Sequence, residues 1–197
     1  MGYFTPEEAA TVEAIVERLI PADDLSPSGK DAGCAVFIDR QLMSPFGDSR
    51  KLYMNAPFQP GTVTPGLQSP VTPAERYRAG LGALNAHCRQ THGGKAFSEL
   101  APEQRDELLR QMEQQSINPF DAADPRALFE LILQNTIEGF FADPIYGGNR
   151  DMVGWKMIGF PGYRYDYRDY IRHYNQDYKL PPVSIGGRPA WQAGGKS

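Results

Sequence analysis

The sequence predicts an all-α protein, with a single domain of about five to six helices, long loops and an extended C-terminal tail. β-Branched residues nowhere alternate with polar ones between turn residues, as they would in half-buried strands. Three segments instead open with a helix-capping residue followed by proline, and each continues with apolar residues at helical spacing. These patterns favour packed helices joined by irregular loops.

The first predicted helix begins at Thr5. The sequence TPEE is a capping box, in which Thr5 accepts from the amide of Glu8 and the Glu8 carboxylate accepts from the amide of Thr5. Pro6 takes the first helical position, where a missing N–H costs nothing. Pro21 ends the helix. Its apolar face consists of Val12, Ile15, Val16, Leu19 and Ile20.

A loop follows from residue 22 to 33, and residues 35–42 form a second, short helix. Residues 55–73 are rich in proline and have no helical or alternating pattern, so they predict a long surface loop. The capping-box pattern recurs at Thr72 and starts a helix that Gly93 and Gly94 close. Tyr77, Leu81, Leu84 and Cys88 lie along that helix.

Two more helices complete the prediction. One is amphipathic, with Leu108, Leu109 and Met112 facing inward and Glu103, Arg105, Asp106 and Glu107 facing outward. The other opens at Asp124 and Pro125 and is the most apolar, which predicts a central, deeply buried position. Its apolar residues are Leu128, Phe129, Leu131, Ile132, Ile137, Phe140 and Phe141.

Charge and hydropathy exclude two classes of function. The net charge of −4 and the lack of clustered Lys and Arg argue against nucleic-acid binding, because the basic residues between Arg164 and Arg172 alternate with acidic ones. No run of apolar residues is long enough for a transmembrane helix.

Motifs for chemistry are weak. The sequence has no nucleophile elbow, phosphate loop or haem-attachment motif, and YGGNRD lacks the preceding strand and third glycine of a dinucleotide site. His87, Cys88 and His92 offer a metal site without a further ligand nearby, or simply histidines favoured near the end of a helix. Cys34 and Cys88 form either one disulfide or two buried free thiols.

The segment DPIYGGNRDMVGWKMIGFPG, from Asp143 to Gly162, favours a protein-contact surface over a reactive pocket. Tyr, Trp and Arg are typical of interface hot spots, and glycine lets another backbone approach closely. Alternatively, the aromatic residues cover the core of this protein itself. The candidate interface residues are Tyr146, Gly147, Gly148, Asn149, Arg150, Trp155, Phe160, Pro161 and Trp191.

A family resemblance rests on the same residues. The segment EGFFADPIYGGNRDMVGWKMIGFPG (138–162), with LIPADD (19–24) and LPPVSIGGRPAW (180–191), resembles the small subunit of membrane-bound, flavin-dependent gluconate 2-dehydrogenases. Small subunits of related fructose, sorbitol and glucose dehydrogenases are similar. The resemblance extends over essentially the whole chain, and the tail is most similar to the gluconate enzymes.

The resemblance implies an accessory subunit without catalytic residues, cofactor or metal of its own. It implies a large partner of the glucose-methanol-choline type that binds FAD, and a multihaem cytochrome c subunit that carries haem c. The small subunit is expected to assist maturation and export of the large one. The complex is expected in the periplasm, associated with the inner membrane.

Relatives commonly have a twin-arginine leader, and none precedes Tyr3. The leader is therefore expected to have been removed, or export to depend on the partner. Residues 1–178 are expected to form the helical domain and 179–197 an extended arm along the partner. The alternative functions are a small enzyme that uses His87, His92 or His173, and a general folding chaperone.

Overall fold

The computed structural model describes residues 1–58, 69–117, 124–164, 167–177 and 180–187. These residues contain six α-helices and no strand, which confirms the predicted all-α class. The predicted boundary at 178 and 179, and Trp191, lie outside the described residues. The helices are α1 Pro6–Leu19, α2 Cys34–Leu42, α3 Pro73–Thr91, α4 Pro102–Glu113, α5 Pro125–Phe141 and α6 Val153–Ile158.

The predicted helix starts are confirmed. The Thr5 hydroxyl accepts from the amide of Glu8 at 3.3 Å, and the Glu8 carboxylate accepts from the amide of Thr5 at 2.8 Å. Thr72 and Glu75 form the same reciprocal pair at the start of α3. Asp124 caps α5 by accepting from two backbone amides, at 3.0 and 3.2 Å. Local sequence therefore determines where these helices begin.

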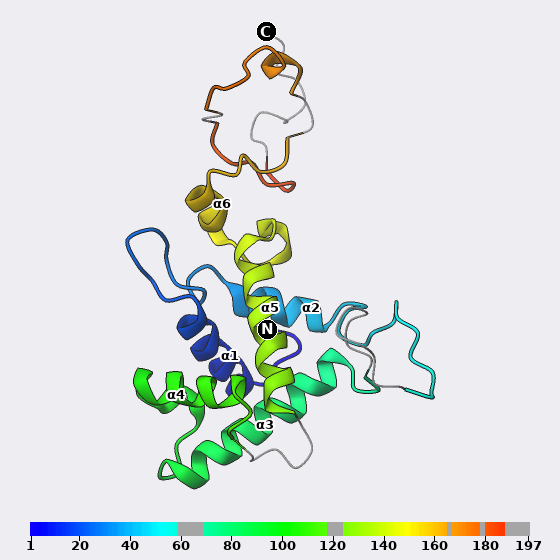
Figure 1. Ribbon diagram of the computed structural model, residues 1–197, viewed down its shortest axis with the longest axis vertical. Helices are drawn as coiled ribbons and strands as arrows, with labels where there is room; N and C mark the ends of the chain where they lie inside the picture. Colours follow the sequence, from blue (N-terminus) through cyan, green and yellow to red (C-terminus); the bar gives the residue numbers. More distant parts are fainter. Residues whose placement is uncertain (59–68, 118–123, 165–166, 178–179, 188–197) are drawn as a thin grey trace.

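Helix α5 is the centre of the fold. It contacts α1, α2, α3 and α4, which surround it, and its C-terminal end contacts α6 (Figure 1). Ile137 is an exception among its apolar residues, since its side chain is 48% exposed. Fully buried core side chains include Val12, Ile15, Val16, Ile38, Tyr77, Leu81, Leu84, Phe97, Met112, Leu128, Ile132 and Phe140.

Asp39 anchors the N-terminus to α2. This buried carboxylate accepts hydrogen bonds from the amides of Gly2 at 2.7 Å, Tyr3 at 3.0 Å and Phe4 at 3.0 Å. The Tyr3 hydroxyl also donates to the carbonyl of Ala74 at the start of α3. The first residues of the chain are thus fixed beside α2 and α3, because three donors satisfy one buried charge.

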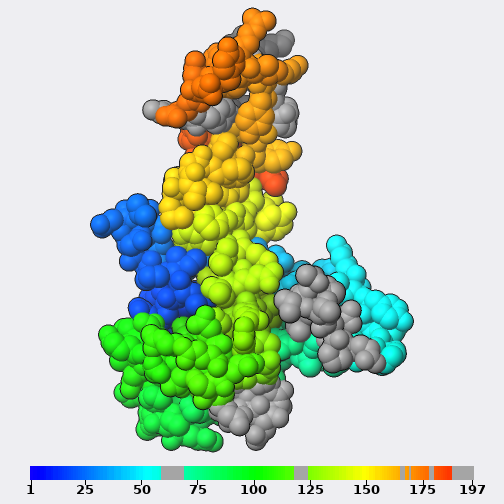
Figure 2. All heavy atoms as spheres, viewed as in Figure 1, coloured from blue at the N-terminus to red at the C-terminus, as the bar shows by residue number. Residues whose placement is uncertain are grey.

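The molecule is elongated. Helices α1 to α5 occupy one end of its long axis, and α6 with the segments after it occupies the other (Figures 1 and 2). The loop before α3, drawn in cyan, projects to one side. No helix of the described residues is long and apolar enough to cross a bilayer.

The two cysteines are buried free thiols in the structure, Cys34 at the start of α2 and Cys88 near the end of α3. Burial raises the pKa of the Cys34 thiol to about 12 and that of Cys88 to about 11, because a thiolate would lose its hydration.

Candidate functional site

The chain turns sharply after α5. Asp143 caps a short 3-10 helix, Pro144–Tyr146, by accepting from the amide of Ile145 at 3.0 Å. Gly147 then adopts a φ of 104°, a left-handed conformation that side chains disfavour. Arg40 of α2 lies against this turn and donates to the carbonyl of Ile145 at 3.2 Å. The turn is therefore fixed to α2 as well as to α5.

Gly148 allows the turn to approach α5 closely. A Cβ atom at this position would lie 2.1 Å from the carbonyl oxygen of Gly139, a distance that no side chain tolerates. The two glycines of the predicted turn consequently serve internal packing in this structure. One provides a positive φ and the other a close backbone contact.

Asn149 holds the turn from within. Its side chain is completely buried, and its amide nitrogen donates to the carbonyl of Ala142 at 2.8 Å. Its side-chain oxygen accepts from the amide of Gly154 at 2.8 Å. Asn149 thus links the end of α5 to the start of α6, and it is placed for internal support.

Trp155 has a similar role. The indole is buried, and its Nε1 donates to the carbonyl of Phe141 at 2.7 Å. Phe160 packs edge-on against the indole, with ring centroids 5.2 Å apart and the planes at 74°. Phe160 itself remains partly exposed. The indole therefore supports an outer aromatic ring that faces solvent.

Residues 180–187 return to this turn. The Asp143 carboxylate accepts from the Ser184 hydroxyl at 2.6 Å and from the amide of Ile185 at 2.8 Å. The amide of Tyr163 donates to the carbonyl of Val183 at 2.7 Å, beside an isolated bridge between Gly162 and Val183. This part of the predicted arm lies along its own turn, since these backbone groups find their partners there.

Several apolar side chains remain exposed around this scaffold. Tyr146 is 51% exposed and Ile158 is 58% exposed, whereas Asn149 and Trp155 are buried. The predicted interface residues therefore fall into a buried group and an exposed group, and Tyr146, Arg150 and Phe160 belong to the exposed one. We call the exposed set the turn surface, which consists of Ile145, Tyr146, Met157, Ile158, Phe160, Tyr163 and Ile185.

A family model described as gluconate 2-dehydrogenase subunit 3 matches residues 6–162. The chain belongs to this family. The match covers α1 to α6 and includes the turn after α5. The family's description designates a subunit of a dehydrogenase complex. Searches of curated proteins and of solved structures found no match.

The three histidines of this subunit 3 chain are not brought together. His87 and His92 line a cavity of about 300 Å³ with Glu103 and Glu107. His173 belongs to the segment after α6, which lies at the other end of the molecule (Figure 1). Burial, and to a smaller extent the neighbouring His92, lower the pKa of His87. Among the described residues, no group of three ligands could hold a metal ion.

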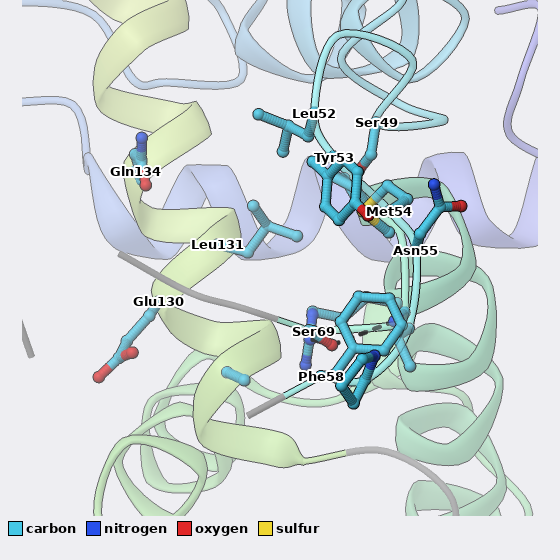
Figure 3. Close-up of a pocket in the computed structure, with 15 residues that line it drawn as sticks. Ser49, Leu52, Tyr53, Met54, Asn55, Phe58, Ser69, Glu130, Leu131 and Gln134 are labelled. Atoms are coloured by element: carbon cyan, nitrogen blue, oxygen red, sulfur yellow. Dashed lines mark hydrogen bonds between the residues drawn. The ribbon is translucent and has the colours of Figure 1, made fainter. Parts of the chain in front are cut away.

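A second hollow of the subunit was not predicted from the sequence. It has a volume of about 700 Å³ and lies between the loop before α3 and one face of α5 (Figure 3). Leu131, Glu130 and Gln134 form the α5 wall, opposite Tyr53 and Phe58 of the loop. The clustered prolines predicted only a loop, because its contact with α5 depends on the tertiary structure.

Proposed function

We propose that this chain is the non-catalytic small subunit of a membrane-bound, FAD-dependent gluconate 2-dehydrogenase-type complex. It binds the large flavoprotein subunit and assists its maturation, stability and export. Membership of the subunit 3 family over most of the chain is the observation that carries this proposal.

The turn surface is the contact region in this proposal. Buried groups such as Asn149 and Trp155 fix the backbone, and exposed apolar side chains surround them. A rigid surface loses little conformational entropy on binding, and exposed aromatic and aliphatic side chains gain free energy when they are desolvated. These properties suit a lasting contact with a protein partner.

The remaining parts of the proposal follow the family. FAD belongs to the large subunit, of the glucose-methanol-choline type, and haem c belongs to a multihaem cytochrome subunit of a heterotrimer. The complex oxidises gluconate or a related sugar in the periplasm and is associated with the inner membrane. The small subunit reaches that compartment together with its folded partner, by twin-arginine export.

Co-expression tests the proposal directly. The cognate large subunit is produced with and without this chain, and its flavin content, solubility, export and dehydrogenase activity are measured. We expect all four to fall when the chain is absent. Normal maturation of the large subunit alone would overturn the proposal. Oxidation of a sugar acid by the isolated small subunit with an artificial acceptor would also overturn it, as would equal binding to unrelated unfolded proteins.

A matched pair of double variants tests the contact region. Tyr146→Ala with Ile158→Ala removes an aromatic and an aliphatic side chain from the turn surface. Leu52→Ala with Tyr53→Ala removes an aliphatic and an aromatic side chain, both more exposed than the first pair, from the loop before α3. We expect only the first pair to weaken capture of the large subunit. Equal capture by both variants would place the contact region elsewhere.

A further inference from the structure

The charges of this protein are divided unevenly along the chain. Residues 1–143 contain 20 Asp and Glu against 12 Lys and Arg, whereas residues 144–197 contain 4 Asp and Glu against 8 Lys and Arg. The helical bundle is therefore acidic, with a formal charge of −8. The C-terminal part, which includes the whole turn surface, is basic, with a formal charge of +4.

Ion pairs strengthen the contrast. Eight of the 12 Lys and Arg in residues 1–143 form ion pairs, as in Arg18 with Asp106 at 2.7 Å and Arg105 with Glu17 at 3.4 Å. Four exposed bases, one on α2 beside the turn and three after residue 143, have no carboxylate of the described residues within ion-pair distance. They are Arg40 on α2, Arg150 in the turn, Lys156 on α6 and Arg172 in the loop beyond α6.

Three of these bases belong to the turn, to α6 and to the segment beyond it, and the fourth lies on α2 beside the turn. Arg40 contacts the turn itself, and Lys156 lies between the buried Trp155 and the exposed Met157. Apolar residues at the centre with charged residues at the rim are the usual anatomy of a protein–protein interface. Complementary charge on the partner would steer the encounter and exclude wrong partners.

We infer that the turn surface binds a protein surface with an apolar centre and an acidic rim. This inference rests on the proposed function and names the chemistry of the large subunit's contact region. A protein is favoured over an anionic membrane because the four bases come from separate segments. Electrostatic lipid-binding sites instead contain clusters of about four to eight adjacent Lys and Arg.

The test compares two charge reversals of equal size. Lys156→Glu with Arg172→Glu changes the basic end, and Lys51→Glu with Lys95→Glu changes two exposed lysines outside it that have no ion pair with a described carboxylate. Arg40 is left intact because it holds the turn. Circular dichroism and thermal unfolding establish that both variants fold. Association with the purified large subunit is then measured at low and at high ionic strength.

We expect salt to slow association of the unaltered subunit, and reversal at the basic end to slow it about tenfold at low salt. The Lys51 and Lys95 reversal should slow it far less. Equal effects of both reversals, or association independent of salt, would overturn the inference. If the unaltered subunit does not bind the large subunit at all, the proposed function itself fails.

A vesicle-binding experiment distinguishes an acidic protein surface from an anionic membrane as the partner of the basic end. Sedimentation with vesicles of phosphatidylglycerol is measured for the same variants. Loss of vesicle binding in the Lys156→Glu and Arg172→Glu variant, with unchanged association with the large subunit, would assign the basic end to lipid and overturn the inference. Lack of vesicle binding in any variant supports a protein partner.

Discussion

The Asp143 carboxylate lies 2.6 Å from the Ser184 hydroxyl, a residue 41 positions later in the chain. The same carboxylate accepts from the amides of Ile145 and Ile185. One buried acid thus joins the turn after α5 to the returning segment 180–187. Because both segments donate hydrogen bonds to this one charged acceptor, each segment helps to hold the other in place.

Replacing Asp143 should release the returning segment. Asp143→Asn leaves one acceptor oxygen in place of two, so hydrogen exchange at the amide of Ile185 should rise at least about tenfold, as expected for loss of a hydrogen bond to a charged group. Ser184→Ala removes only one donor and should have a smaller effect. Unchanged exchange at Ile185 in Asp143→Asn would show that the bridge at Val183 holds the segment without the acid.

Asn149 offers a prediction with a matched control. Asn149→Ala leaves the carbonyl of Ala142 and the amide of Gly154 without partners, and it places alanine at a φ of 46°. We expect the free energy of unfolding in urea to fall by roughly 2–4 kcal/mol. Asn175 also has a left-handed φ, 59°, but is exposed. Asn175→Ala should therefore lose only the conformational part, about 1 kcal/mol, and equal losses would contradict the supporting role of Asn149.

Two glycine substitutions should change stability in opposite directions. Gly148→Ala forces a Cβ atom against the Gly139 carbonyl and should lower the free energy of unfolding by about 1–3 kcal/mol. Gly82→Ala, within α3, meets no atom within 4 Å and should raise it by roughly 0.5–1 kcal/mol. Thermal unfolding of both variants measures the difference. A stable Gly148→Ala protein would mean that the turn can separate from α5.

Acid should weaken the link between α1 and α4. The hydrogen bond from Arg18, supported by its charge, lowers the pKa of Asp106 below its ordinary value. The stabilisation is therefore complete above the ordinary pKa of an aspartate, near 4, and is lost as pH falls through the lowered one. Asp106→Asn should flatten the acid side of the stability–pH curve, measured by urea unfolding. In a protein that already carries Arg18→Gln, Asp106→Asn should not alter the stability–pH curve further, because the ion pair is already absent.

The two thiols should be unreactive in the folded protein. Burial raises the pKa of Cys34 and of Cys88, so little thiolate is available near pH 8. A chromogenic disulfide reagent should detect no rapidly reacting thiol in the native chain and two thiols after unfolding without reductant. Detection of none after unfolding would demonstrate the disulfide that the structure does not contain.

The sequence predicts helix starts well because their signals are local. Thr5, Thr72 and Asp124 find their hydrogen-bond partners within three residues. The turn was predicted as a feature, but not which of its side chains face solvent. Asn149 and Trp155 are residue types found equally in interfaces and in cores, and only their bonds to the carbonyls of α5 and its C-cap decide the matter. The hollow beside α5 depends on segments distant in sequence, so no local pattern predicts it.

The anchoring of the N-terminus by Asp39 has a practical consequence for labelling. Because the amides of Gly2 to Phe4 are fixed beside α2 and α3, a fluorophore or affinity tag attached at Met1 has a short and defined tether. The N-terminus lies at mid-height on the molecule's long axis, away from the far end that α6 approaches (Figure 1). The distance between a fluorophore at Met1 and one on a bound partner can therefore be measured from a position that the structure defines.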